Sequence, residues 1–289
     1  LDGIYHKITV EYPMKRILDA SQTLIEGDFS VRIPLPHGYD SENQLDVLIE
    51  NFNRIAEELS SVETLRTDFI SNVSHELKTP LTAISGYAEL IEHGMADADN
   101  SKRFAGEIHK NSVRLLSLIN DILDMSRIES GKLLLNNGPL LTRRLIEGVS
   151  TLCAGQAAAK GVRYRCVVDP SLQAEYTGDS MKLQQVLVNI LSNAVKFTDS
   201  GGEVVLRASQ VQAKKENAVV RFVIRDTGVG ISPEFLPHLF EPFSQESTGT
   251  TAAYGGSGLG LAISKSVVDL MDGRISVRSE KGKGTEFII

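Results

Sequence analysis

The sequence predicts a multidomain protein in which an all-α coiled coil and a four-helix-bundle dimer precede an α+β sandwich domain. Up to about residue 130, apolar residues recur at steps of three and four, the spacing of amphipathic helices. After about residue 138, strand patterns mix with helical ones, as in a sheet covered by helices. The 289 residues suffice for two or three domains, and we place boundaries at 6–61, 62–131 and 138–289.

The composition narrows the class of protein. A formal net charge of −7 gives no support for nucleic-acid binding, so we expect no nucleic-acid partner. Two cysteines, Cys153 and Cys166, give no disulfide framework, and the six histidines show no pair at zinc-ligand spacing. No apolar run reaches eighteen residues, so we expect no membrane contact within the chain. Because no initiator Met or signal peptide is present, we expect a segment of a longer protein.

The first segment, residues 6–61, predicts two helices joined by an extended connector. Pro13 suits the first turn of a helix that ends at Gly27, and Pro34 keeps the connector from becoming helical. The second helix carries apolar residues at alternating steps of three and four, a seam that would pair with another helix. These residues are Leu45, Leu48, Phe52, Ile55, Leu59 and Val62.

The second segment, residues 62–131, begins with a helix that carries His75. His75 lies roughly 200° around the helix from Leu77, so it points to solvent when the apolar stripe is buried. Glu76 is adjacent, Thr79 lies one turn further on the same face, and Pro80 tends to kink the helix. An exposed imidazole beside a carboxylate is a nucleophile with a base in reach, although a lone surface histidine is the commoner case. The stripe consists of Ile70, Val73, Leu77, Leu81, Ile84, Ala88 and Ile91.

A break at residues 93–101 predicts a second helix and therefore a helical hairpin. This helix is apolar on two faces, so we expect two copies to pack as a four-helix bundle, which makes a homodimer. Gly131 is the expected C-cap and hinge. One face carries Phe104, Ile108, Asn111, Leu115, Leu118, Ile122 and Met125, and the other Val113, Leu116, Ile119 and Leu123.

The third segment, residues 138–289, predicts a mixed sheet packed against helices. Asp179 or Ser180 is the expected N-cap of its central helix. The expected helices cover residues 140–159, 182–196 and 259–271, and the expected strands cover 162–169, 203–211, 218–226 and 274–289.

The central helix presents Asn189, Asn193 and Lys196 at steps of four and three. Two amides and an ammonium on one face suit a phosphate and a hydrated Mg²⁺ ion, which prefers oxygen ligands. Downstream, Asp226 ends a strand before Gly228 and Gly230, so its carboxylate can accept a hydrogen bond from an exocyclic amine.

Three further motifs follow in the same segment. Phe240 and Phe243 bracket a turn, and a glycine-rich stretch leads into a helix whose first amides can hold an anion. Residues 244–255 read as a mobile lid without any Arg or Lys. Each of these motifs, taken alone, is weak evidence for a nucleotide-binding site. The glycine-rich stretch includes Gly256, Gly258, Leu259 and Gly260, and a late turn includes Thr285.

Taken together, these strings resemble a known family. Residues 74–84, Ser-His-Glu-Leu-Lys-Thr-Pro-Leu-Thr-Ala-Ile, closely resemble the phospho-acceptor box of sensor histidine kinases. Residues 189–198 and the glycine motifs resemble the Bergerat-type ATP-binding domain shared by these kinases, type II topoisomerases, MutL-like proteins and a chaperone family. Residues 6–61 resemble a HAMP domain, which relays signals from a membrane-spanning helix. Only Glu42 of its usual Asp-Glu-Ile-Gly string is retained, and a generic coiled-coil linker is the alternative.

The resemblance implies a kinase that phosphorylates its own His75 from Mg-ATP and passes the phosphoryl group to an aspartate of a response regulator. In such kinases Glu76 would orient the imidazole and Thr79 would position water for dephosphorylation of the partner. The parent protein would be anchored in the cell membrane, with this portion in the cytoplasm.

The resemblance also assigns a nucleotide site. Asn193 would ligate Mg²⁺, and Asn189 would support the metal and the phosphates. Lys196 would contact phosphate, and Asp226 would accept a hydrogen bond from the adenine amine. In relatives that hydrolyse ATP, a Glu that activates water holds the place of Asn189. The remaining implied contacts with the nucleotide are Phe197, Gly228, Gly230, Phe240, Phe243, Gly256, Gly258, Leu259, Gly260 and Thr285.

Two alternatives stay open. The chain could be a signalling scaffold without catalytic activity, acting through dimerisation and partner binding. It could also be a gyrase-like ATPase, which the amide at Asn189 and the His75 helix disfavour.

Overall fold

The structure is a computed structural model that describes residues 11–35, 43–95, 97–213, 218–246 and 257–289. It forms two compact units, Leu1–His75 and Glu76–Ile289, which we describe separately. Among the described residues, no helix is both long enough and apolar enough to cross a membrane.

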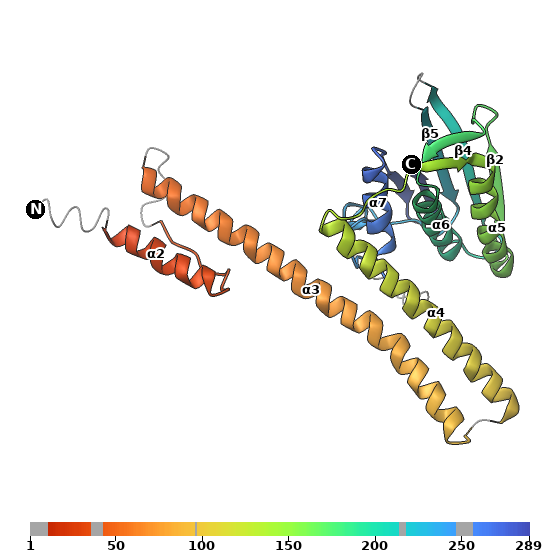
Figure 1. The fold of residues 1–289 in the computed structure, drawn as a ribbon, viewed down its shortest axis with the longest axis horizontal. Coiled ribbons are helices and arrows are strands. Elements are labelled where there is room, and N and C mark those ends of the chain that lie inside the picture. Colours follow the sequence, from red (N-terminus) through yellow and green to blue (C-terminus); the bar gives the residue numbers. More distant parts are fainter. Residues whose placement is uncertain (1–10, 36–42, 96, 214–217, 247–256) are drawn as a thin grey trace, which may run out of the picture. The chain divides into compact units, whose positions relative to one another are not determined.

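In the first unit, helix α2 (Tyr12–Ile25) packs beside the start of helix α3 (Gln44–Glu92) (Figure 1). Pro13 lies in the first turn of α2 as predicted, and Gly27 follows its end with a φ of +96°. Asn53 fastens the connector to α3, because its side chain accepts a hydrogen bond from the amide of Ile33 (2.8 Å) and donates one to the carbonyl of Ile33 (2.9 Å). The small core consists of Ala20, Ile33 and Ile49, with Ile17, Val31, Leu35 and Phe52 packed around it.

The face of α3 that packs in this core shares only Phe52 with the predicted seam. Ile49 and Ala56 are buried, whereas Ile55 and Val62 of the seam are more than half exposed. The seam therefore stays available for another helix. Glu42, the one retained residue of the HAMP-like string, lies outside the described residues.

Helix α3 is one continuous helix of 49 residues where the sequence predicted two. It runs through Pro80, which is fully buried. The prediction of a buried stripe around His75 is wrong for the single chain, since Ile70 and Leu81 are 55% and 54% exposed. A hairpin of two helices can cover only one face of each helix, so a wide apolar surface stays exposed.

The second helix of the hairpin is α4 (Ala98–Glu129), capped by Asp97, which accepts a hydrogen bond from the amide of Asn100. The C-cap of α4 is Ser130, one residue before the predicted Gly131. Gly131 follows with a φ of +64°, and its amide donates to the carbonyl of Ile128. The rings of Tyr87 on α3 and Phe104 on α4 stack with centroids 5.3 Å apart. The second apolar face of α4 is exposed: Val113, Leu116, Ile119 and Leu123.

After the hairpin, helices α5, α6 and α7 pack with a five-stranded mixed sheet of order β2-β4-β5-β7-β6 (Figure 1). The β2–β4 pair is parallel and the other pairs are antiparallel, which confirms the predicted α+β sandwich. The elements are β1 (Gly138–Leu141), α5 (Thr142–Lys160), β2 (Arg163–Val168), β3 (Glu175–Gly178), α6 (Ser180–Phe197), β4 (Glu203–Ala213), β5 (Ala218–Asp226), η2 (Leu236–His238), α7 (Gly260–Leu270), β6 (Ser276–Glu280) and β7 (Gly284–Ile288).

Two predicted elements need correction. Leu140 and Leu141 belong to β1 rather than to a helix, because β1 pairs with β3, a strand that the sequence did not predict. The predicted strand at 274–289 is a hairpin of β6 and β7, which turns at the predicted late turn. Gly282 in the turn and Gly284 at the start of β7 both have positive φ. In both cases pairing with a distant or folded-back strand decides the structure, and local periodicity does not report it.

Helix α6 connects the core to the polar motifs. Its apolar face buries Leu187, Ile190 and Leu191 completely. Asp179 is its N-cap and accepts hydrogen bonds from the amides of Lys182 (3.0 Å) and of Asn136 in the segment after α4 (2.9 Å). The cap thus fastens the incoming chain to the helix.

We predict that Asp179→Ala lowers the free energy of unfolding by about 1–2 kcal/mol, because two amides lose their acceptor. Urea unfolding followed by circular dichroism, with hydrogen exchange of the α6 amides, measures the effect. Asp179→Asn keeps an acceptor and should cost less, and Asp97→Ala at the exposed cap of α4 is the matched control. Equal losses for the Ala and Asn variants would contradict the capping role.

Candidate active site

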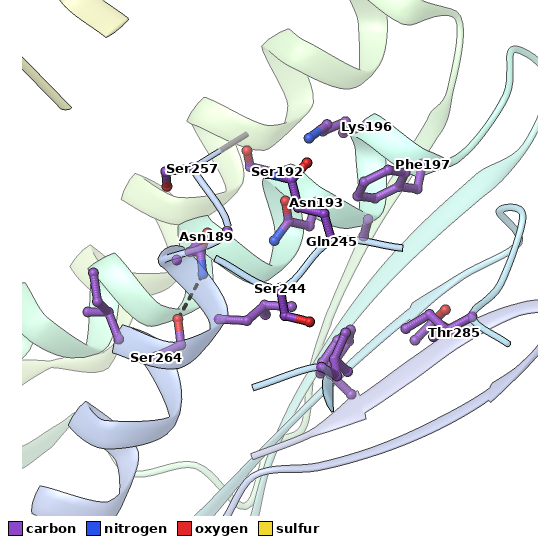
Figure 2. Close-up of a pocket in the computed structure, with 18 of the residues that line it drawn as sticks. Asn189, Ser192, Asn193, Lys196, Phe197, Ser244, Gln245, Ser257, Ser264 and Thr285 are labelled. Atoms are coloured by element: carbon purple, nitrogen blue, oxygen red, sulfur yellow. Dashed lines mark hydrogen bonds between the residues drawn. The ribbon is translucent and has the colours of Figure 1, made fainter. Parts of the chain in front are cut away.

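A cavity of about 960 Å³ lies among α4, α6, the start of α7 and the ends of β5 and β7 (Figure 2). The structure brings predicted site residues from distant parts of the sequence together in its wall. Those that line it are Asn189, Asn193, Lys196, Phe197, Asp226, Gly230, Gly258, Gly260 and Thr285.

The polar face of α6 forms one side of this cavity. Asn189, Asn193 and Lys196 follow one another along the helix, as their spacing predicts (Figure 2). The side-chain amide of Asn189 donates a hydrogen bond to the hydroxyl of Ser264 on α7 (2.8 Å), which sets the orientation of the amide. A Cβ atom at Gly260 would lie 2.5 Å from Oδ1 of Asn189, so any larger residue at the start of α7 would force the Asn189 side chain to move.

The ammonium of Lys196 lies in a cationic environment. Burial lowers the pKa of Lys196, and the charges of Arg114 on α4 and Lys160 on α5 lower it further. The ammonium also lies 4.7 Å from the ring centroid of Phe197. Because neighbouring cations and burial both oppose the charged lysine, an anion in this part of the cavity would stabilise it.

Asp226 is the buried carboxylate of the cavity. Its Oδ1 accepts hydrogen bonds from the amides of Gly228 (2.9 Å) and Thr285 (3.1 Å). Burial raises the pKa of Asp226 above its ordinary value, although both hydrogen bonds favour the ionised form. Among the described residues both bonds end on Oδ1, so Oδ2 is the oxygen suited to accept from a ligand amine.

Four predicted residues, Gly228, Leu259, Phe240 and Phe243, do not line the cavity. Gly228 holds Asp226, and a Cβ there would lie 2.3 Å from the carbonyl oxygen of Phe197. Leu259 is fully buried, and the amide of Phe243 donates to the carbonyl of Gly258 (3.0 Å). Phe240 is half-buried. Gly256 and residues 247–255 of the predicted lid lie outside the described residues.

Sequence reasoning missed several residues in the cavity wall. Ser264 binds Asn189, and Lys281 in the β6–β7 turn pairs with Glu246 (2.7 Å). Burial raises the pKa of Glu246, but the bond from Lys281 outweighs burial and the pKa lies below its ordinary value. Ser117, Asn120 and Asp121 on α4 also line the cavity. No local pattern marks these residues, because their partners are distant in the sequence.

The predicted phospho-acceptor is exposed. His75 and Thr79 both face solvent on α3, one turn apart. Oε2 of Glu76 lies 3.7 Å from the guanidinium of Arg114 on α4, so this carboxylate already has a cationic neighbour within the hairpin. His75 and the cavity belong to different units.

The donor chemistry of the cavity fits a magnesium ion bound together with phosphates. Among the described residues, no group of three or more His, Cys, Asp or Glu side chains could hold a metal alone. The amide oxygens of Asn189 and Asn193 are hard ligands, and Mg²⁺ usually takes one or two protein oxygens along with water and phosphate oxygens.

Comparison with known proteins identifies both regions. Residues 65–131 match the His Kinase A (phospho-acceptor) domain, and residues 178–289 match the histidine kinase-, DNA gyrase B- and HSP90-like ATPase domain. The sensor protein GacS of Pseudomonas syringae pv. syringae is 34% identical over 97% of this chain and 35% of its own length. The autoinducer 2 sensor kinase/phosphatase LuxQ of Vibrio parahaemolyticus is 41% identical over 78% of this chain and 26% of its own length.

A solved structure agrees with these relatives. The crystal structure of full-length ShkA in complex with AMPPNP is 34% identical, has a TM-score of 0.56, and aligns with 78% of this chain and 44% of ShkA. The chain thus belongs to the sensor histidine kinases, as a segment that carries the phospho-acceptor and ATPase domains. It spans about a third of the length of GacS.

We predict that Gly260→Ala weakens binding of AMPPNP about tenfold, because the new Cβ must displace Asn189 and break its bond to Ser264. Isothermal titration calorimetry measures the affinity. The matched control is Gly148→Ala on α5, where the nearest atom would lie 3.6 Å from the Cβ, and it should bind as the unmodified protein does. Unchanged binding in Gly260→Ala would exclude the proposed role of Asn189.

Proposed function

We propose that this chain is the kinase portion of a two-component system, which phosphorylates His75 from Mg-ATP and passes the phosphoryl group to an aspartate of a response regulator. The observation that carries the proposal is the cavity, where Asp226, two asparagines and Lys196 meet in a segment of the ATPase family. The exposed His75, in the segment of the phospho-acceptor family, is the acceptor.

The polar groups of the cavity suit the parts of ATP. Oδ2 of Asp226 accepts from the exocyclic amine of adenine, and Gly228 and Thr285 hold the carboxylate in place. Lys196 contacts phosphate, because a phosphate anion offsets the repulsion between the Lys196 ammonium and the cations Arg114 and Lys160. Asn193 is the proposed ligand of Mg²⁺, supported by Asn189, and the ion would neutralise phosphate charge.

His75 would act as the phosphoryl acceptor through its position and through a hydrogen bond to Glu76. An imidazole nitrogen of His75 attacks the γ-phosphorus in line with the departing ADP, and Glu76 accepts a hydrogen bond from the other ring N–H. The guanidinium of Arg114, 3.7 Å from Oε2 of Glu76, helps to orient this carboxylate. We propose that the residues around Gly131 act as the hinge that lets the domain with the nucleotide reach His75.

The chemistry of Asn189 favours transfer to histidine over hydrolysis. A carboxylate at this position could take a proton from water, but an amide cannot. The side-chain amide of Asn189 also donates a hydrogen bond to the hydroxyl of Ser264, which fixes its orientation. This disfavours the gyrase-like ATPase. The inactive scaffold is disfavoured because the polar positions of a nucleotide site are present.

We further propose the assembly of the protein. The exposed apolar faces of α3 and α4 suit a homodimer in which two hairpins form a four-helix bundle. The domains are then a HAMP-like relay at 6–61, a dimerisation and phosphotransfer hairpin at 62–131 and a catalytic domain at 138–289. A relay of this kind would connect the cytoplasmic portion to a membrane-anchored sensor.

His75→Gln should abolish labelling of the protein by γ-³²P-ATP, because the acceptor nitrogen is lost. The expected label on the unmodified protein is acid-labile and requires Mg²⁺, as chelation with EDTA would demonstrate. His93→Gln is the matched control, since His93 is another exposed histidine of the hairpin and should leave labelling unchanged. Label that survives His75→Gln would sink the proposed function.

Thr79 is the proposed residue for a phosphatase activity, as it lies one turn after His75, and the relative LuxQ is named a kinase/phosphatase. Thr79→Ala should slow dephosphorylation of the phosphorylated response regulator about tenfold or more while autophosphorylation persists, because the hydroxyl no longer orients water. The rate of phosphate release from purified partner measures this. If the rate is unchanged in Thr79→Ala, the phosphatase role is excluded.

A further inference from the structure

The five-stranded sheet has one covered face and one open face. Successive side chains of a strand point to opposite faces, and the register aligns them between strands. Leu206, Ile224 and Phe287 lie opposite one another on β4, β5 and β7 and are buried on the side where the helices pack. The residues that alternate with them form the other face, which we call the outer face, and they are exposed or half-buried.

The outer face is rich in arginine, although the chain as a whole has a net charge of −7. Among the described strand residues of this face, every basic residue is an arginine and none is a lysine. Arginine is enriched and lysine depleted at protein interfaces, because the planar guanidinium binds a carboxylate through two parallel hydrogen bonds. The arginines are Arg163 and Arg165 on β2, Arg207 on β4, Arg221 and Arg225 on β5 and Arg278 on β6, and the carboxylates are Glu203, Glu280 and Glu286.

Arg207 lies at the centre of this set. Its partner on β5 is Val223, so Arg221 and Arg225 are its diagonal neighbours on that strand. Its partner on β2 is Val167, which makes Arg165 a third diagonal neighbour. Long side chains at such positions reach one another, and like charges there repel.

Few carboxylates offset this charge. Within the described part of the chain, Arg165 pairs with Glu203 (3.8 Å), whereas Arg207, Arg221 and Arg225 form no ion pair. All of these arginines are exposed. The unpaired guanidinium groups therefore favour a partner that brings carboxylates to them.

Apolar side chains lie among the arginines. Val167, Val223 and Ile288 share one row across the sheet with Arg207. Val167 is 38% exposed, and the other two are half-buried. A polyanion such as nucleic acid or a lipid headgroup layer would leave this apolar row unused and would meet the glutamates of the same face. A protein surface with both apolar and acidic side chains matches both features.

We propose that the outer face of the sheet is a docking surface for an acidic amphipathic helix of a partner protein. A helix is the element that covers a sheet face in layered proteins. Its apolar side chains would pack on Val167, Val223 and Ile288, and its Asp and Glu side chains would pair with Arg207 and Arg221. This surface goes beyond the proposed kinase function and does not depend on the nucleotide site.

The test uses a synthetic helical peptide with Leu and Glu along one face, carrying a fluorescent label, and measures its anisotropy with the full chain. Arg207→Gln combined with Arg221→Gln should raise the Kd about tenfold, because two guanidinium–carboxylate pairs are lost. The matched control is Arg143→Gln combined with Arg144→Gln, two exposed arginines of α5, which should leave the Kd unchanged. A peptide with Gln in place of Glu should bind the unmodified protein about as weakly as the acidic peptide binds the first variant.

Two further variants separate specific docking from attraction between net charges. Arg207→Lys combined with Arg221→Lys keeps the charge but loses the forked hydrogen bonds, so binding should weaken. Val167→Thr should also weaken binding, because an exposed methyl group is replaced by a hydroxyl. Unchanged affinity in the Gln variant, or full affinity in the Lys variant, would overturn the inference.

Other occupants of the face give different results. Single-stranded DNA or phosphatidylglycerol vesicles that bind through Arg207 and Arg221, where the peptide does not bind, would overturn the inference in favour of a nucleic acid or a membrane. A lower sedimentation mass of the Gln variant would assign the face to a second copy of the chain and overturn it as well. The Gln variant should bind AMPPNP as the unmodified protein does, so that a loss of peptide binding is separate from the fold and from the nucleotide site.

Discussion

The structure of the nucleotide-binding segment depends on one helix that is apolar on one face and polar on the other. Leu187, Ile190 and Leu191 of α6 are fully buried, and this burial fixes how the helix is rotated in the domain. The rotation in turn directs Asn189 and Asn193 into the cavity. Burial of the apolar face thus supplies the free energy that positions the polar groups, which gain little from packing themselves.

The other side of the cavity depends on backbone groups that approach one another closely. Asp226 is held by the amide of Gly228, two residues along the chain, and by the amide of Thr285, 59 residues along the chain. Side chains at Gly228 or Gly260 would collide with Phe197 or Asn189. At these two positions glycine is needed because neighbouring atoms occupy the space that a side chain would fill, not because the backbone must be flexible.

The helical hairpin is stabilised in a different way, because it leaves much apolar surface exposed in one chain. The core of the catalytic segment closes on itself, but Ile70 on α3 and Leu116 on α4 remain exposed. The exposed apolar surface suits the proposed homodimer, in which a second hairpin would cover it. A surface that must meet several partners in turn cannot be buried permanently in its own chain.

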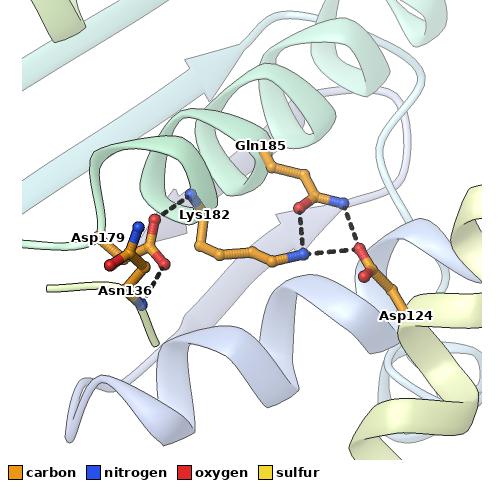
Figure 3. Close-up of polar contacts among 5 residues, drawn as sticks. All are labelled: Asp124, Asn136, Asp179, Lys182 and Gln185. Atoms are coloured by element: carbon orange, nitrogen blue, oxygen red, sulfur yellow. Dashed lines mark hydrogen bonds and ion pairs between the residues drawn. The ribbon is translucent and has the colours of Figure 1, made fainter. Parts of the chain in front are cut away.

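The sequence by itself determined the classes of the segments, the amphipathic helices, the exposure of His75 and most of the cavity. Those features follow from local spacing, as in the steps that join Asn189, Asn193 and Lys196. Tertiary structure decided what local spacing does not encode. Pairing of β1 with β3 places Leu140 in a strand, Ser264 accepts a hydrogen bond from Asn189, and Lys182 pairs with Asp124 (Figure 3). It also decided which apolar stripes are buried, because burial depends on a second surface that the periodicity of one helix does not specify.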